Sequence, residues 1–155
     1  MTPRAGSVLV VTSVFPRWEG DSTPPFVQNQ CELMVQTGWS IAVLAPHASG
    51  AKFRETVNGV TIYRYPYVLP WGLQQLCYNG GMLVNLKEKP WTKVLLPFLY
   101  LAQLFALLIA CLRLKPDLLH SHSLLPQGLS ACWIGRLLRI PHITTSHGND
   151  VFGLK

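Results

Sequence analysis

Residues 94–112 form an almost wholly apolar run of nineteen residues between Lys93 and Arg113. A membrane-spanning helix needs about 20 apolar residues, so the run meets the length requirement for a span. Pro97 near its start and Gln103 in its middle argue against a span, and a fully buried helix can have the same composition. The run therefore predicts one long apolar helix. It leaves three placements open: buried in a core, lying in a membrane interface, or crossing a bilayer.

The segments on either side of this run help to choose among those placements. Residues 7–13 (SVLVVTS) and 117–121 both predict short apolar strands. If these strands pair in one parallel sheet, the chain between them cannot cross a bilayer, because the two strands would then lie on opposite sides of it. A buried or interfacial helix is therefore favoured over a span. Aromatic and Lys residues at 71–93 resemble interfacial anchors, but they are equally typical of a surface loop with packed aromatic side chains.

Strands and helices alternate along the chain. Residues 39–45 and 141–146 predict two further buried strands, and Asn58-Gly59 lies between short apolar runs, as in a β-hairpin. Helical spacing follows Pro24-Pro25 as far as Gly38, and again over residues 127–138. This alternation predicts an α/β fold with a Rossmann-like open, mostly parallel sheet and flanking helices.

Composition limits the classes of function. The chain has 155 residues, 49% hydrophobic and 13% charged, which excludes disorder and fits one domain. Its 13 Lys and Arg are scattered, with no run of three, so the net charge of +6 favours anionic small molecules or an anionic lipid surface over nucleic acid. The four cysteines stand far apart and predict buried thiols in a reducing compartment.

Ligands of an open parallel sheet bind beyond the carboxyl ends of its strands. The loops at 14–23, 120–127 and 147–152 follow predicted strands, so we expect them to converge on one crevice. The first loop has neither a dinucleotide fingerprint nor a P-loop. However, Gly20 precedes a helix N-terminus, where backbone N–H groups favour an anion such as a diphosphate. The alternative is an ordinary turn between a strand and a helix.

Three histidines lie at or just after the carboxyl ends of the later strands. We expect His120 and His122 on opposite faces of their strand, which disfavours a metal site shared between them. His122 lies nearer the carboxyl end, where an imidazole can donate to a sugar hydroxyl or a phosphate. The segment His147-Gly148-Asn149-Asp150 brings a titratable donor and a carboxylate to the same edge. The alternative there is a turn with Asp150 as a helix N-cap.

Five segments together carry a family resemblance. In order along the chain, residues 15–26 (FPRWEGDSTPPF), 43–47 (VLAPH), 115–122 (KPDLLHSH), 125–128 (LPQG) and 145–150 (TSHGND) resemble the N-terminal half of family 4 glycosyltransferases. The resemblance implies a GT-B fold, in which two Rossmann-like domains face a cleft. It also implies transfer of a sugar from a nucleotide-sugar donor, with retention at the anomeric carbon, and with neither a metal nor another cofactor.

The resemblance also assigns residues. Gly20 matches the glycine that approaches the donor diphosphate, although many members have two adjacent glycines where this chain has Glu19-Gly20-Asp21. His122 matches the catalytic-site histidine that contacts the transferred sugar. His147, Gly148 and Asp150 match a loop on the acceptor side.

On this interpretation residues 1–155 are the N-terminal, acceptor-side domain of a hexosyltransferase-type enzyme, truncated before its C-terminal donor-binding domain and inactive alone. The expected partners are a nucleotide-sugar, a sugar, polysaccharide or lipid-linked acceptor, the missing domain and, peripherally, the cytoplasmic face of a membrane. No nucleic acid is expected. Two alternatives are a non-catalytic membrane-associated α/β binding domain and a fragment of a GT-B-like nucleotide-sugar epimerase.

Overall fold

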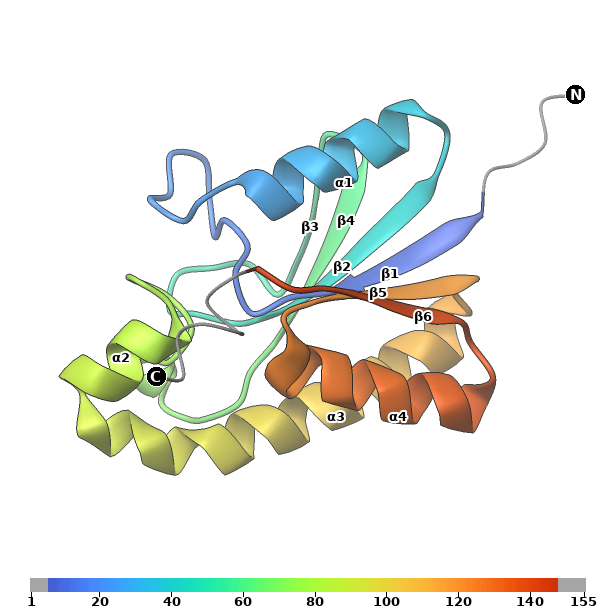
Figure 1. The fold of residues 1–155 in the computed structure, drawn as a ribbon. Coiled ribbons are helices and arrows are strands. Elements are labelled where there is room, and N and C mark those ends of the chain that lie inside the picture. Colours follow the sequence, from blue (N-terminus) through green and yellow to red (C-terminus); the bar gives the residue numbers. More distant parts are fainter. Residues whose placement is uncertain (1–5, 148–155) are drawn as a thin grey trace, which may run out of the picture.

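The computed structural model describes residues 6–147, which form an α/β fold around a six-stranded sheet (Figure 1). The strands lie in the order β3-β4-β2-β1-β5-β6. All neighbours are parallel except β3, which pairs antiparallel with β4 at one edge. The predicted open, mostly parallel sheet is confirmed. The strands are β1 Ser7–Val11, β2 Ser40–Pro46, β3 Arg54–Val57, β4 Val60–Tyr65, β5 Leu118–His122 and β6 His142–Thr145.

Helices cover both faces of the sheet. One face carries α1, and the other carries α3 and α4, while α2 lies beyond the carboxyl ends of the strands (Figure 1). The helices are α1 Phe26–Gln36, α2 Met82–Glu88, α3 Leu95–Leu114 and α4 Leu129–Leu138, with short helical turns at Trp71–Leu73, Pro90–Val94 and Leu124–Gly128.

The sheet separates two hydrophobic cores. In β1, Val8 and Val10 point to the α1 side, and Leu9 and Val11 point to the side of α3 and α4. Successive side chains of a strand point to opposite faces, so a strand that is apolar at every position supplies both cores. This is why the continuous apolar run of β1 forms a central strand.

A predicted hairpin turn and a predicted helix end both occur at glycines with positive φ. Asn58 and Gly59 both have positive φ, 49° and 82°, as a two-residue hairpin turn requires. A Cβ on Gly59 would lie 2.7 Å from Val35 Cγ1, so the turn also packs closely against α1. Gly38, with φ 94°, follows the last turn of α1, where the sequence predicts the helix to end.

The apolar run forms α3, which crosses from β4 to β5 and packs lengthwise under the sheet (Figure 1). By length and composition alone, Pro90–Leu114 could cross a membrane. However, β4 and β5 belong to the same sheet, so α3 is a crossover helix and not a span in this fold. One stripe of α3 is buried: Leu95, Leu99, Gln103, Leu107 and Cys111.

Gln103 is the polar member of that stripe. Its Oε1 accepts a hydrogen bond from the Tyr65 hydroxyl (3.1 Å), and its Nε2 donates to the Pro126 carbonyl (3.2 Å) and to the Ser130 hydroxyl. A buried amide needs such partners to offset its desolvation. Gln103 therefore links α3 to the segment that follows β5. It is buried against the sheet, so it does not give α3 a polar outer side.

Helix α2 was not predicted from the sequence. Its seven residues are too few to show a helical period. Asn85 in α2 donates from Nδ2 to the carbonyls of Leu76 (3.2 Å), Tyr78 (2.6 Å) and Gly81 (3.0 Å). These contacts fix the loop at 76–81, which leads into α2, at the carboxyl edge of the sheet.

Candidate functional site

Three loops meet at the carboxyl edge of the sheet, as predicted. They border a cavity of about 420 Å³, which we call the His122 cavity. The segments after β1, β5 and β6 all contribute to it. Its wall contains residues 12–14 and 22–24, Phe26, residues 77–84, His122, Ser123, Leu125 and His147.

His122 ends β5 and is buried by its neighbours. Its Nδ1 lies 2.8 Å from His147 Nε2, and the two rings are stacked with 5.1 Å between their centroids. His147 in turn contacts Phe26, the first residue of α1, at 4.7 Å between ring centroids. The start of α1 and the last described loop therefore touch through the His147 ring, which also lies against His122.

The expectation that His120 and His122 lie on opposite faces is wrong. Their ring centroids are 4.4 Å apart, because residues two apart along a strand share a face. His120 Nε2 is 2.8 Å from Thr145 Oγ1, so this histidine is held by β6. Between residues 6 and 147 no group of three or more His, Cys, Asp or Glu side chains is arranged to hold a metal ion.

Burial keeps these imidazoles neutral. Desolvation, followed by the neighbouring His120 and His147, lowers the pKa of His122 from 6.5 to about 3. Desolvation also lowers the pKa of His120. At neutral pH, therefore, either His122 or His147 donates across the 2.8 Å contact. When His147 donates, His122 Nε2 carries a proton that it can donate to a ligand oxygen.

Tight backbone contacts position the loop after His122. Ser123 has φ 84°, and its carbonyl accepts a hydrogen bond from the Gly128 N–H (3.1 Å). A Cβ on Gly128 would lie 3.1 Å from that same carbonyl oxygen. Glycine at 128 therefore lets this loop fold back tightly beside the cavity.

One wall of the cavity was not predicted from the sequence: the loop at 77–81 together with the first turn of α2. The Tyr78 hydroxyl donates to the Pro46 carbonyl (2.7 Å) and ties this loop to the end of β2. Asn79, Gly80 and Gly81 all have positive φ. The Asn-Gly-Gly sequence is a turn signal that could have marked this segment as a loop beside the site.

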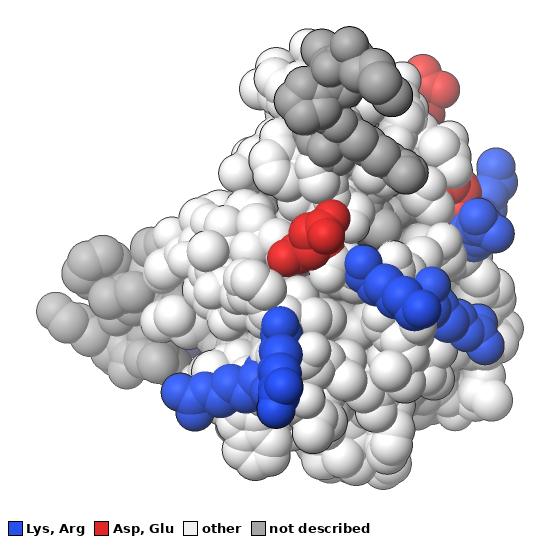
Figure 2. Space-filling model, turned by 90° about the vertical axis from the view of Figure 1, so that its right-hand side faces the viewer, with Lys and Arg blue, Asp and Glu red and all other residues white. Residues whose placement is uncertain are grey.

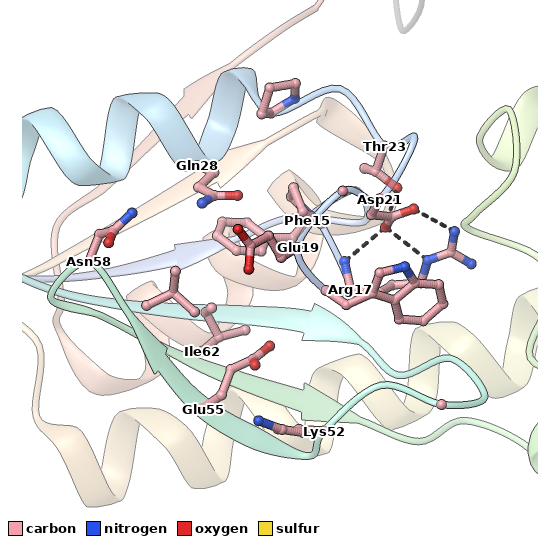
Figure 3. Close-up of a pocket in the computed structure, with 16 residues that line it drawn as sticks. Phe15, Arg17, Glu19, Asp21, Thr23, Gln28, Lys52, Glu55, Asn58 and Ile62 are labelled. Carbon is pink, nitrogen blue, oxygen red and sulfur yellow. Dashed lines mark hydrogen bonds and ion pairs between the residues drawn. The ribbon is translucent and has the colours of Figure 1, made fainter.

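Gly20 opens into a different cavity. This second cavity, of about 700 Å³, lies between the first loop with the start of α1 and the β3-β4 hairpin (Figure 3). Gly20 has φ 78°, and an added Cβ would meet nothing within 4 Å. Gly20 and His122 are thus not brought together within one cavity, although Thr23 lines both.

An ion pair holds the first loop in shape (Figure 3). The Arg17 guanidinium donates to both carboxylate oxygens of Asp21, at 2.6 and 2.9 Å, and the Arg17 N–H and Thr23 hydroxyl also donate to Asp21. These hydrogen bonds lower the pKa of Asp21 well below its usual range. The carboxylate of Asp21, which follows Gly20, is therefore paired with Arg17.

Of the residues assigned to the acceptor side, His147 lies at the His122 cavity. Gly148 and Asp150 lie outside the described residues, so their predicted roles stay predictions.

A family model matches most of the chain. The profile of the family described as "Glycosyl transferase 4-like domain" matches residues 24–154. A curated relative from Bacillus subtilis (strain 168), named "Putative teichuronic acid biosynthesis glycosyltransferase TuaC", is 24% identical over 93% of this chain. The chain spans 36% of the length of that relative.

A solved structure shares the fold. A sucrose-phosphate synthase from Thermosynechococcus elongatus superposes with a TM-score of 0.52 at 15% sequence identity, over 93% of this chain and 65% of that chain. At this identity the match supports the fold alone.

Proposed function

The chain belongs to the glycosyl transferase 4-like domain family, and from that premise we propose that it is the acceptor-side domain of a retaining glycosyltransferase. The enzyme would use a nucleotide-sugar of the hexosyl type and a polysaccharide or lipid-linked acceptor. A donor-binding domain would supply the other side of the cleft. The 36% share of the curated relative's length supports this division of the enzyme.

The observation that carries the proposal is the place of His122 in the wall of the His122 cavity, with its ring against His147. Its Nδ1 is hydrogen-bonded to His147, so its Nε2 is a donor in one tautomer and an acceptor in the other. As a donor, Nε2–H would hydrogen-bond a hydroxyl of the transferred sugar. A neutral imidazole suits this role, since its protonation does not change near neutral pH.

The reaction forms one bond and breaks one. The acceptor oxygen bonds to the anomeric carbon, the bond from that carbon to the diphosphate oxygen breaks, and the nucleoside diphosphate leaves with the electron pair. The acceptor proton passes to the leaving group. Stabilising the developing diphosphate charge needs fixed donors, which the donor-binding domain would contribute together with the loop that contains Gly20.

We propose no resident metal or cofactor for this step. His147, Gly148 and Asp150 would line the acceptor side. The protein would work at the cytoplasmic face of a membrane as a peripheral protein, because a lipid-linked acceptor has to be reached there.

The test requires the coding sequence beyond Lys155. We expect it to encode a second domain of alternating strands and helices, and the longer protein to transfer labelled sugar from a panel of nucleotide-sugars to membrane lipid or polysaccharide. The anomeric configuration of the product should match that of the donor. Formation of free sugar without a glycosidic bond would support an epimerase and contradict the proposal.

The 155-residue chain by itself should be inactive in the same assay, because leaving-group stabilisation would come from the absent side of the cleft. Sugar transfer by this chain alone would contradict the division into two domains.

A further inference from the structure

The outer face of α3 is apolar although solvent reaches it. The buried stripe of α3 faces the sheet. The opposite side of the same helix, with Val94 just before it, exposes Phe98, Leu101, Phe105, Ile109 and Leu112. Phe98 is 52% exposed and Phe105 61% exposed. In all, 28% of the most apolar stretch of this helix is buried. A helix that is apolar all round normally has both sides covered.

The apolar face continues onto α4, which packs beside α3 under the same face of the sheet (Figure 1). Trp133 and Leu137, one turn apart on α4, are 60% and 69% exposed. A contiguous apolar patch of this kind marks a contact surface, because soluble proteins seldom leave one to water. We call these exposed residues of α3 and α4 the outer α3–α4 face.

Basic residues stand at both ends of this face. Lys93 lies in the short helical turn that leads into α3, while Arg113 lies in the last turn of α3 and Lys115 caps it. Arg136 and Arg139 stand at the same end of α4. Figure 2 views the molecule from the side on which α3 and α4 end, and blue side chains gather there on a mostly uncharged surface.

The charge is concentrated in this part of the chain. Residues 81–141 contain seven Lys and Arg but two Asp and Glu, so they hold five of the six net positive charges. The apolar strip is free of charge, and the cations flank it. An apolar strip between two basic ends is the pattern of a surface that lies in the plane of an anionic bilayer.

We propose that the outer α3–α4 face binds an anionic lipid bilayer, with α3 lying parallel to the membrane plane. The apolar side chains enter the boundary between headgroups and acyl chains, and the Lys and Arg side chains at both ends reach lipid phosphates. This inference deepens the membrane contact proposed above and rests on it. It places the sheet edge with the His122 cavity to one side of the bilayer surface, within reach of a lipid-linked acceptor.

Vesicle flotation tests the surface. The 155-residue chain is mixed with vesicles of phosphatidylcholine alone or with phosphatidylglycerol added, without any nucleotide-sugar. We expect flotation with the anionic vesicles, weakening as salt rises, and at least about tenfold weaker binding for the double variant Phe98→Gln, Phe105→Gln. Leu33→Gln, at an equally exposed position on α1 across the sheet, should bind as the wild type does.

Equal flotation of the double variant and the wild type would overturn the proposal, and so would absence of wild-type binding to anionic vesicles. Sedimentation velocity on the same samples tests whether the face instead binds a second copy of the chain. A dimer that the double variant abolishes, without vesicle binding, would assign the face to a second copy of the chain and also overturn the proposal.

A second measurement does not depend on how the double variant folds. Brominated lipids quench tryptophans that enter the bilayer, so the wild type should lose fluorescence on binding. Trp133→Phe should reduce that loss, and Trp39→Phe, at the amino-terminal end of β2, should not. Equal quenching in the two variants would contradict the assigned face. Sugar transfer by the longer protein without vesicle binding would contradict the proposed lipid-binding face and leave the proposed transferase activity supported. Vesicle binding without sugar transfer would contradict the transferase activity and leave the lipid-binding face supported.

Discussion

The two faces of the sheet differ in what they show to the outside. On one face, α1 places polar side chains such as Asn29, Gln30 and Gln36 at exposed positions. On the other face, α3 exposes apolar side chains along its whole length. Both helices bury one apolar stripe against the same strands, so the core does not require the difference. The contrast indicates that the two faces meet different surroundings.

The two faces of β5 differ in a related way. His120 and His122 lie on the α1 side, and His122 reaches the His122 cavity. Ser121, between them, points the other way, and its hydroxyl pairs with His142 (2.9 Å) and Thr144 (2.9 Å). Adjacent residues of one strand thus serve a candidate site and a structural hydrogen-bond cluster. The predictions below test whether this division by face holds.

The largest change in stability should come from the inner stripe of α3. Leu107 is fully buried, and Leu107→Ala should lower the free energy of unfolding by about 2–5 kcal/mol, since it removes packed atoms and leaves a cavity. Urea denaturation measures the change. A loss below about 1 kcal/mol would mean that α3 does not pack on the sheet as described.

The contact between α1 and the hairpin should be the next most sensitive. Gly59→Ala combines a positive φ with a Cβ placed 2.7 Å from Val35 Cγ1, and should cost about 1–2 kcal/mol. Gly72→Ala is the matched control, because an added Cβ there meets nothing within 4 Å and φ is not in the left-handed region. Similar losses in the two variants would contradict the close approach of α1 to the turn.

The histidine cluster should make stability depend on pH. The pKa of His122 is lower in the folded than in the unfolded state, so the unfolded chain takes up the proton first. The stabilisation from keeping this histidine neutral is therefore complete above about pH 6.5, and is lost gradually as the pH falls toward 3. His120 and His142, whose pKa values are also lowered, add to the same slope.

Urea denaturation between pH 7.5 and pH 5 measures that slope, in a range where most carboxylates remain ionised. His122→Asn should make the slope shallower, and Ser22→Ala, in the wall of the same cavity, should leave it unchanged. An unchanged slope in His122→Asn would place the pH dependence elsewhere.

The smallest change in stability is expected on the outer α3–α4 face. Phe105→Gln should alter the free energy of unfolding by no more than about 0.5 kcal/mol, because the ring is already mostly exposed. The comparison with Leu107→Ala, two residues away on the same helix, separates packing from docking. A loss as large as that of Leu107→Ala would mean that this ring is part of the core.

Much of the fold could be predicted because its signals are local. The β-branched run of β1, the Asn58-Gly59 turn and the glycine after α1 each require a particular backbone. The exposed side of α3 could not be predicted, since the sequence of a helix that is apolar on all sides does not indicate which side faces the sheet. That side is decided by the packing of α3 against β2, β4 and α4.

The candidate site was only partly predictable for a similar reason. The convergence of loops follows from parallel strands. The wall at 77–84 depends instead on three hydrogen bonds that the buried Asn85 side chain donates to backbone carbonyls, a side-chain contact that no sequence pattern marks. The shared face of His120 and His122 was available from the two-residue period of a strand and was misassigned. Their mutual burial, and the contact of His122 with His147, needed the fold.

One comparison tests the assignment of chemistry to the α1 side of β5 most directly. In the longer protein, His122→Ala should lower sugar transfer by at least about 100-fold, because a positioned donor to the transferred sugar is lost. Ser121→Ala, one residue away on the opposite face, should keep sugar transfer within a fewfold of the wild type. Full activity in a folded His122→Ala protein would contradict the assignment, and so would an equal loss in both variants.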